Sequence, residues 1–250
     1  MFFEIQRLSK SFGALQAVYD VAFNIREGQI MSVIGPNGAG KTTLFNLITG
    51  VLKPDEGDIF FKDQRVTDLP PHKLCRLGLT RSFQVTNIFQ GLTVFENIRL
   101  ASQGRTTRLN LFSSVEGLHE PIKEAERILN LLGLWDQRDE LAGNLSHGDQ
   151  RYLEIGMTLA ARPSMILLDE PTAGMTPMET RATIGLIKQL KGEVTILLIE
   201  HDIDLVFAVS DWILVMNQGL VLAQGSPGDV KANKEVQKAY FGEELDAGSP

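Results

Sequence analysis

The sequence has little that would support a disulfide-bonded or membrane-spanning protein. Its single cysteine, Cys75, excludes an internal disulfide framework, so we expect a reducing compartment. The longest apolar runs, such as residues 165–168 and 196–199, have the length of strands and fall far short of the roughly 20 residues that span a bilayer. Glu4 and Arg7 interrupt the apolar segment that a secretory signal requires. We therefore expect a chain that neither crosses a membrane nor carries a secretory signal.

An excess of positive charge is also missing. The 250 residues include 24 Lys and Arg against 31 Asp and Glu, a net charge of −7, and the basic residues are scattered along the chain. Such a surface offers no electrostatic footprint for nucleic acid, so no nucleic-acid partner is expected. A hydrophobic content of 43% with 22% charged residues is typical of a globular protein with a large core.

A glycine-rich segment that ends in Lys-Thr carries the strongest chemical signal. It follows the short apolar run 30–34 and comprises Gly35, Pro36, Asn37, Gly38, Ala39, Gly40, Lys41 and Thr42. Glycines let backbone N–H groups and the next helix N-terminus surround an anion. Lys41 would then reach the β- and γ-phosphates of a nucleotide, and the Thr42 hydroxyl would bind Mg²⁺. An incidental glycine turn is the alternative.

The pattern of apolar residues predicts an α/β organisation. Residues 2–8 and 17–25 have strand character, with a turn over 9–13 between them. From about residue 84 to residue 161 the apolar period becomes helical, which suggests an inserted helical subdomain. Residues 165–168 and 194–199 are continuous apolar runs that suit buried parallel strands. A helix over 176–190 and a terminal hairpin turning at Gly219 complete the expected core.

Two carboxylates end the apolar run at 165–168. Asp169 and Glu170 would stand at the carboxyl end of a buried strand, where ligands of open α/β sheets collect. Asp169 would hold Mg²⁺ through water, and Glu170 would act as the general base on the water that attacks the γ-phosphate. A solvated acidic strand end is the alternative.

Further polar residues follow other predicted strands. His201 ends the strand at 194–199 and could orient the attacking water, or be a structural histidine. Gln84 could join Mg²⁺ or its water to the helical subdomain, or be an ordinary loop residue. The apolar pair Ile88 and Phe89 could belong to the core or face a partner.

A second anion site is suggested by the segment LSHGDQ at 145–150. Ser146 is in an N-cap-like position before a helix that runs to about residue 161. Its hydroxyl and the N–H of Gly148 could bind a phosphate, although Ser146 could also only cap the helix. Since the glycine-rich segment already serves one nucleotide, a second phosphate site implies a second molecule.

The order of these motifs resembles the ATP-binding cassette ATPases over essentially the whole chain. The glycine-rich segment extended to Thr43, Gln84, LSHGDQ, ILLDE at 166–170 and His201 occur in that family's order and at similar spacing. The resemblance implies an α/β fold with a P-loop NTPase (RecA-like) core, an antiparallel β subdomain and an inserted α-helical signature subdomain. The core would comprise about 1–84 and 162–230, the helical subdomain about 85–161, and a C-terminal helix and tail 231–250.

The resemblance also assigns roles to residues. It implies ATP and Mg²⁺ as cofactors, with Glu170 and His201 catalytic and Thr42, Gln84 and Asp169 around the metal. The segment LSHGDQ corresponds to the signature motif of the family. In a head-to-tail dimer, each ATP would lie between the phosphate loop of one subunit and the signature motif of the other subunit. The implied nucleotide-binding residues are Phe12, which would stack on adenine or be an ordinary core or turn residue, the loop Gly35, Pro36, Asn37, Gly38, Ala39, Gly40, Lys41, Thr42 and Thr43, and Gln84, Ser146, Gly148 and Gln150.

Two positions depart from the family pattern. His147 replaces the first glycine of the signature, which adds a titratable group at the implied dimer interface. The loop after Glu170 reads Ala173-Gly174-Met175-Thr176, so Thr176 stands where the family usually has Asp. That change puts the usual contact of the Asp across the dimer in doubt.

Four segments resemble one branch of the family, the ATP-binding subunits of bacterial branched-chain amino acid importers: Ala-Gly-Met at 173–175, Gly-Asp-Gln at 148–150, residues 93–97, and the tail 233–242 that ends in Ala-Tyr-Phe-Gly. That branch implies transmembrane permease subunits, a second ATP-binding subunit in a homodimer or heterodimer, and indirectly a periplasmic solute-binding protein. It places the chain peripherally on the cytoplasmic side of the inner membrane. Urea or amide uptake and lipopolysaccharide export are related alternatives, and no residue identifies the solute.

Alternative functions from other classes are those of a soluble cassette protein acting on DNA or ribosomes, a regulatory ATP-binding module, and a metabolic kinase. The first usually carries two cassettes, a coiled-coil insertion or basic patches, which this chain lacks. A kinase would need an acceptor pocket that the sequence does not suggest.

Overall fold

The structure is a computed structural model that describes residues 1–82, 88–103 and 119–245. The chain forms two compact units: Met1–Leu74 with Leu190–Pro250, called the first unit, and Cys75–Gln189, called the second unit. In the described ranges, no helix combines the length and the apolar character needed to cross a membrane.

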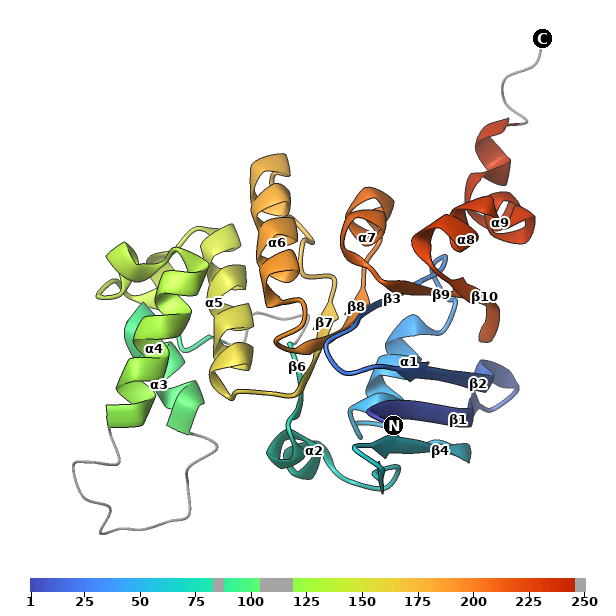
Figure 1. The fold of residues 1–250 in the computed structure, drawn as a ribbon, viewed down its shortest axis with the longest axis horizontal. Helices are drawn as coiled ribbons and strands as arrows, with labels where there is room; N and C mark the ends of the chain where they lie inside the picture. Colours follow the sequence, from blue (N-terminus) through green and yellow to red (C-terminus); the bar gives the residue numbers. More distant parts are fainter. Residues whose placement is uncertain (83–87, 104–118, 246–250) are drawn as a thin grey trace. The chain divides into compact units, whose positions relative to one another are not determined.

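An antiparallel sheet occupies the N-terminal part of the first unit (Figure 1). Its strands, in the order β2-β1-β4-β5, are β1 (Phe3–Phe12), β2 (Leu15–Ile25), β4 (Glu56–Phe61) and β5 (Gln64–Arg65). Phe3, Ile5 and Leu8 of β1 are buried, and the edge-to-face contact between Phe3 and Phe61 joins β1 to β4 in the core. The alternation of buried and exposed residues is that of a sheet with one covered face.

Three parallel strands and one antiparallel edge strand form the second sheet region of the first unit. Their order is β10-β9-β3-β8, with β3 (Ile30–Ile34), β8 (Thr195–Ile199), β9 (Trp212–Asn217) and β10 (Leu220–Gly225). β3 pairs in parallel with both β8 and β9, and every residue of β3 and β8 is buried. A strand covered on both faces is mainly apolar, which explains the hydrophobic runs. The buried hydroxyls of Ser32 and Thr195 are hydrogen-bonded, to the hydroxyl of Ser210 and to the N–H of Gly28.

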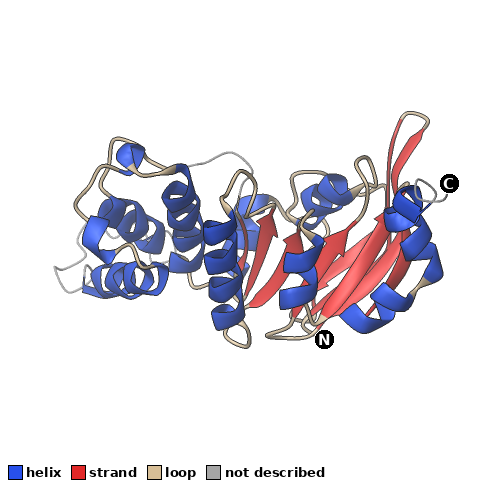
Figure 2. Cartoon of the chain, turned by 90° about the horizontal axis from the view of Figure 1, so that it is seen from above, coloured by secondary structure: helices blue, strands red, loops and turns tan. Residues whose placement is uncertain are grey.

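Helices cover these strands. Figure 2 shows them in blue beside the red strands, near the C-terminus. The helices assigned to this unit are α1 (Lys41–Ile48), α7 (Ile203–Val209), α8 (Pro227–Ala232) and α9 (Lys234–Leu245). One core cluster joins Ile34, Val206, Val215, Val230 and Val236 from β3, α7, β9, α8 and α9. The short helix α2 (Pro71–Leu77) lies at the boundary between the two units.

The second unit contains two parallel strands and a group of helices. β6 (Leu79–Arg81) pairs in parallel with β7 (Met165–Asp169). The helices are α3 (Val94–Gln103), α4 (His119–Leu132), α5 (His147–Ala160) and α6 (Pro177–Leu190), with short 3-10 turns at Trp135–Gln137 and Ala142–Asn144. α3, α4 and α5 pack together (Figure 1). A Cβ at Gly156 of α5 would lie 2.4 Å from Leu132 and 2.9 Å from Ile98, so this glycine permits the close packing.

Most of the expected strands and helices are confirmed, with shifted boundaries. The turn expected over 9–13 is wrong, because β1 continues to Phe12 and the chain turns at Gly13 and Ala14. β1 remains paired there through register shifts against β2, which sequence periodicity does not reveal. The helices α2, α7 and α8 were not expected, since each has only six or seven residues.

Candidate functional site

The glycine-rich segment leaves the carboxyl end of β3, between β8 and β9. Pro36, Asn37 and Gly38 are exposed, and α1 begins at Lys41 without a side-chain cap on its N-terminal N–H groups. Uncapped N–H groups and the helix dipole favour an anion at this end of α1. The structure therefore gives this segment the backbone arrangement of a phosphate-binding loop.

Gly40 is required by the path of the backbone. Its φ is 100°, a conformation that side chains disfavour, and a Cβ there would lie 2.1 Å from the carbonyl oxygen of Ala17 in β2. The loop is also held by its Ala39 carbonyl, which accepts the N–H of Gly219 at 3.0 Å from the β9–β10 turn. The shape of the loop thus depends on both neighbouring hairpins.

Lys41 lies inside this loop. Its ammonium donates to the carbonyl oxygens of Gly35 at 2.7 Å and Pro36 at 3.0 Å, and the residue is buried. A buried ammonium needs such acceptors. The charge is thereby held next to the exposed N–H groups of the loop, while Thr42 at the start of α1 is exposed and Thr43 is half-buried.

Phe12 ends β1 and is 48% exposed, so the interpretation as a core residue is wrong. Its ring lies 5.8 Å from the ammonium of Lys10, and its neighbours Gly13 and Ala14 form the turn. An exposed ring at a turn is available for stacking on another ring, which stays a prediction.

His201 leaves the same edge of the parallel strands as the loop. β3 and β8 are in register, with Val33 opposite Ile199, and both chains continue beyond these residues in the same direction. The backbone N–H of His201 donates to the carboxylate of Glu200 at 3.0 Å, and the His201 side chain is exposed. Glu200 itself is buried, so it anchors the strand end from which the imidazole projects.

In the second unit, β7 brings Asp169 and Glu170 to its carboxyl end. Asp169 is buried, whereas Glu170 is half-buried and has φ of 48°. The left-handed region is unfavourable for a residue with a Cβ, by about 1 kcal/mol or more. This turn directs the chain away from the strand immediately after Asp169, so the two carboxylates do not continue the strand alternation.

Asp169 is held by a residue that the sequence interpretation missed. The Arg81 guanidinium, at the end of β6, donates through Nη2 to Oδ2 of Asp169 at 2.6 Å. The other carboxylate oxygen, Oδ1, is buried and has no hydrogen-bond partner in the described ranges. Buried carboxylate oxygens normally have partners, so Oδ1 has the character of a ligand for a hard cation such as Mg²⁺. The residues present therefore fit a divalent cation.

The segment LSHGDQ begins α5 as expected. Ser146 is the N-cap, and its hydroxyl accepts the N–H of Asp149 at 3.1 Å, which confirms the capping role. The Gln150 amide donates to the carbonyl of Leu145 at 3.2 Å and so supports the chain before the cap. Phosphate binding by Ser146, Gly148 and Gln150 stays a prediction.

Gly148 is in direct contact with the start of α6. A Cβ at Gly148 would lie 2.1 Å from Oε1 of Glu179, so a larger residue here would require the Glu179 side chain to shift. The other oxygen of Glu179 accepts the backbone N–H of Thr176 at 2.7 Å and its hydroxyl at 2.8 Å. These hydrogen bonds, with the nearby His147, hold the pKa of Glu179 below its usual value. Thr176 thus caps α6, a role that the spacing Thr-x-x-Glu could have indicated.

Gln84 falls in 83–87, outside the described residues. Immediately after this range, Ile88 is 9% exposed and Phe89 is 54% exposed. Asn97 of α3 accepts the N–H of Phe89 at 2.8 Å and donates to its carbonyl at 3.1 Å. Ile88 therefore belongs to the core, while Phe89 is presented to solvent on a braced loop.

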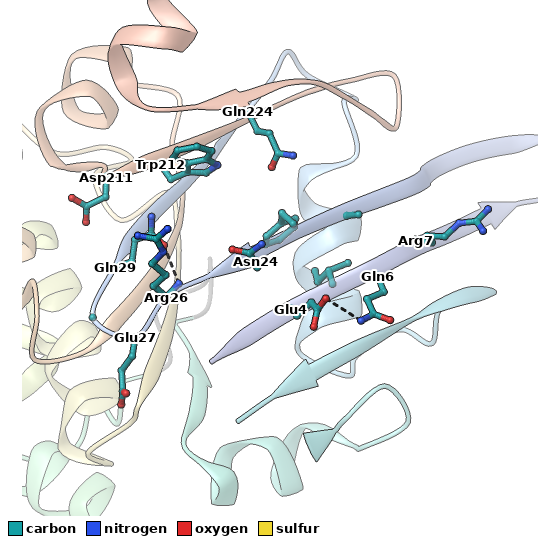
Figure 3. A pocket seen from close by; sticks show the side chains of 14 residues that line it. Glu4, Gln6, Arg7, Asn24, Arg26, Glu27, Gln29, Asp211, Trp212 and Gln224 are labelled. Atoms are coloured by element: carbon teal, nitrogen blue, oxygen red, sulfur yellow. Dashed lines mark hydrogen bonds between the residues drawn. The ribbon is translucent and has the colours of Figure 1, made fainter. Parts of the chain in front are cut away.

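A broad pocket of about 960 Å³ in the first unit contains none of these residues (Figure 3). It is lined by charged and amide side chains beside Trp212, and Gln6 donates to Glu4 at 2.9 Å within it. Arg26 and Gln29 lie just before β3, at the end of that strand opposite the glycine-rich segment. This pocket is therefore separate from the loop that carries the phosphate-binding geometry.

Comparison with known proteins extends the resemblance. The family described as "ABC transporter" matches residues 18–173, and the family described as "Branched-chain amino acid ATP-binding cassette transporter" matches residues 221–246. The chain is 41% identical to the high-affinity branched-chain amino acid transport ATP-binding protein LivG of Salmonella typhimurium, over 96% of this chain and 97% of the relative.

Solved structures of ATP-binding cassettes have a similar fold. The ADP conformation of an ATP-binding cassette of an ABC transporter has a TM-score of 0.84 and 32% identity, over 96% of this chain and 98% of that one. A dimeric post-hydrolysis cassette bound to ADP and Pi has a TM-score of 0.77 and 28% identity, over 90% and 99%. The P-loop NTPase class expected from the sequence is confirmed.

Proposed function

Because this chain belongs to the ABC transporter family of ATP-hydrolysing subunits, we propose that it energises an importer of branched-chain amino acids. The single observation that carries the solute class is the match of residues 221–246 to the branched-chain amino acid family. This segment covers most of β10 with α8 and α9, outside the nucleotide-binding motifs. It favours this branch over urea or amide uptake and lipopolysaccharide export.

The phosphate loop gives the proposed ATP site its geometry. The N–H groups between Gly38 and Lys41 would surround the β- and γ-phosphates, and the Lys41 ammonium would transfer from loop carbonyls to phosphate oxygens. Phe12 would stack on the adenine. Bound Mg²⁺, held by Thr42 with Gln84 and Asp169, would neutralise charge on the phosphates.

Hydrolysis is assigned to Glu170 and His201. Glu170 would accept the proton of the attacking water, since its carboxylate follows the metal-holding Asp169 and leaves the strand by a left-handed turn. His201 would donate a hydrogen bond to the γ-phosphate, because its exposed imidazole follows the strand adjacent to that of the phosphate loop.

A second ATP-binding subunit would complete each site. Ser146, Gly148 and Gln150 lie at the N-terminus of α5, a position suited to the γ-phosphate of the nucleotide bound by the opposite subunit. A cassette of similar fold is dimeric with ADP and Pi bound. Binding of ATP would close the dimer and hydrolysis would release it, because the γ-phosphate contacts both subunits only before it is cleaved.

Transmembrane permease subunits are the proposed partners on the membrane side, with a periplasmic solute-binding protein acting through them. Phe89 supports this assignment, because a large apolar side chain is 54% exposed on a loop fixed by Asn97. Such a braced apolar residue suits contact with a permease segment at the cytoplasmic face of the membrane.

Co-purification tests the proposal. Glu170→Gln should retain ATP but lose hydrolysis, so tagged Glu170→Gln from detergent-solubilised membranes with ATP should carry two polytopic permease subunits, identified by mass spectrometry. The double variant with Lys41→Ala is the control for ATP dependence. Leucine, presented with the solute-binding protein, should stimulate ATP hydrolysis by the wild-type complex. Stimulation only by urea, an amide or a lipopolysaccharide would reject the solute class.

Soluble partners alone would contradict the transport assignment and favour a soluble cassette protein. Transfer of the γ-phosphate to a small molecule rather than to water would favour a kinase. Both outcomes are measured on the same preparation, by mass spectrometry of the partners and by labelled-phosphate product analysis.

A further inference from the structure

We propose that Arg81 is a positioning residue for the divalent cation: it fixes one oxygen of Asp169 so that the other is presented to the metal. The inference rests on the metal role proposed above for Asp169, and it assigns that role an additional residue. Arg81 is the last residue of β6 and Asp169 the last residue of β7. Neither residue type nor spacing marks Arg81 as functional, because the two residues are 88 positions apart in the sequence.

The strand register places the two side chains on the same face of the pair. Arg81 is opposite Leu167 in the parallel ladder, and Asp169 is two residues beyond Leu167. Side chains two residues apart point to the same face, so the guanidinium reaches the carboxylate diagonally across the ladder. The backbone N–H of Ser82 donates to the carbonyl of Leu167 at 2.9 Å, which fixes the end of β6 beside β7. The position of the guanidinium is thus set by the sheet.

Burial makes the contact obligatory. The side chains of Arg81 and Asp169 are 10% and 1% exposed, and the Nη2–Oδ2 distance is 2.6 Å. An ionised carboxylate buried to this degree needs a cation or hydrogen-bond donors. Arg81 supplies that cation permanently, so the carboxylate of Asp169 is paired and oriented before any metal ion binds.

The two oxygens of Asp169 are used unequally, and this separates the proposal from an ordinary structural ion pair. Oδ2 is held by Arg81, whereas Oδ1 is buried and without a hydrogen-bond partner among the described residues. Glu124, the carboxylate of another ion-pair cluster in the same unit, differs. Its Oε1 accepts from Arg127 at 2.8 Å and its Oε2 accepts from Arg162 at 2.8 Å. Buried polar atoms are normally hydrogen-bonded, and both oxygens of Glu124 follow this rule, whereas Oδ1 of Asp169 does not.

The test separates the affinity for nucleotide from the dependence of that affinity on metal. A fluorescent ATP analogue is titrated into the protein with EDTA and then at increasing Mg²⁺ concentrations. The quantity compared is the Mg²⁺ concentration that produces half of the maximal change in affinity for the ATP analogue. In Arg81→Met this concentration should rise about tenfold, the scale expected when a residue that orients a metal ligand is removed. The affinity measured in EDTA should stay within about twofold of wild type, since Arg81 acts through the metal ligand rather than on the phosphates. Arg81→Lys should be intermediate, about threefold, because an ammonium keeps the charge but not the planar geometry.

Two further variants make the result specific. Arg162→Met removes a guanidinium from the buried Glu124 in the same unit, and it should leave the Mg²⁺ dependence unchanged. Asp169→Asn should raise the Mg²⁺ concentration needed for half of the maximal change in affinity at least as much as Arg81→Met does. If Asp169→Asn has no effect, the proposed metal role of Asp169 fails, and the inference about Arg81 fails with it.

If Asp169→Asn has its effect and folded Arg81→Met binds Mg²⁺ like wild type, only the role of Arg81 is overturned. Folding is checked by circular dichroism and thermal unfolding. Should Arg81→Met not fold, Arg81→Lys decides, and wild-type Mg²⁺ dependence in Arg81→Lys overturns the proposal.

Discussion

Gly40 and Glu170 both have positive φ angles, but for different reasons. At Gly40 the angle of 100° is combined with close approach to the Ala17 carbonyl, so no side chain fits. At Glu170 the angle of 48° occurs in a residue that has a Cβ, so its conformational cost must be offset by surrounding contacts. The glycine was predictable from the phosphate-loop motif, whereas the strained turn at Glu170 has no sequence signal.

Gly40→Ala should therefore destabilise the protein more than Gly38→Ala. Gly38 has φ of 80°, and a Cβ at this position would meet no atom within 4 Å among the described residues, so its substitution adds only backbone strain of about 1–2 kcal/mol. Gly40→Ala adds the clash with Ala17 and should cost at least about 2 kcal/mol more. Urea unfolding of the two variants measures the difference. Equal free energies of unfolding would contradict the tight approach between the loop and β2.

At the scale of elements, helices are stabilised by caps between residues close in sequence and by ion pairs between residues far apart in sequence. Ser146 caps α5 and Thr176 with Glu179 caps α6, both within four residues of sequence. The ion pairs of Glu124 on α4 instead extend to Arg162, which is 38 positions away. The caps follow from short motifs, but the longer pair depends on how the helices pack.

Glu124→Gln should lower stability in a pH-dependent way. Burial raises the pKa of Glu124, but hydrogen bonds from Arg127 and Arg162 outweigh this and hold the pKa below its usual value of 4.5. The ionised carboxylate therefore stabilises the fold at neutral pH, and that contribution is lost as the pH falls through the folded-state pKa. Because both arginines are half-exposed, we expect a loss of about 1–2 kcal/mol at pH 7.

The measurement is urea unfolding of wild type and Glu124→Gln between pH 8 and pH 3.5. The difference in free energy of unfolding should be constant down to about pH 5 and shrink below the usual carboxyl pKa. A difference that grew on acidification would contradict the assigned direction of the pKa shift.

At the scale of the whole molecule, the proposed function requires two chains. Glu170→Gln should form an ATP-dependent dimer, because uncleaved ATP would keep both subunits in contact through the γ-phosphate. Size-exclusion chromatography with light scattering should show about twice the monomer mass of 27.7 kDa with ATP and Mg²⁺. With ADP it should show the monomer.

A double variant, Glu170→Gln with Lys41→Ala, is the control and should remain monomeric with ATP. A dimer that forms equally without nucleotide would contradict ATP as the link between subunits. A monomer under every condition would favour a heterodimer with a sister subunit, which co-purification would identify.

The sequence by itself determined the features whose residues are contiguous or follow a short period. The phosphate loop at 35–43, the apolar runs of β3, β7 and β8, and the Ser146 cap depend on neighbouring residues, so their physics is visible in the chain. The ordered motifs together were sufficient to indicate the family, which the comparisons confirm.

Only the tertiary structure decided the contacts that join distant segments. The ion pair of Arg81 with Asp169, the approach of Gly40 to Ala17 and the fit of Gly148 against Glu179 each arise from sheet pairing or helix packing. Such contacts depend on register and side-chain direction, which one-dimensional patterns do not contain. The carboxylate of Asp169 is the clearest case, because its Oδ2 is held by Arg81, 88 positions away in the sequence, while its Oδ1 has no hydrogen-bond partner among the described residues.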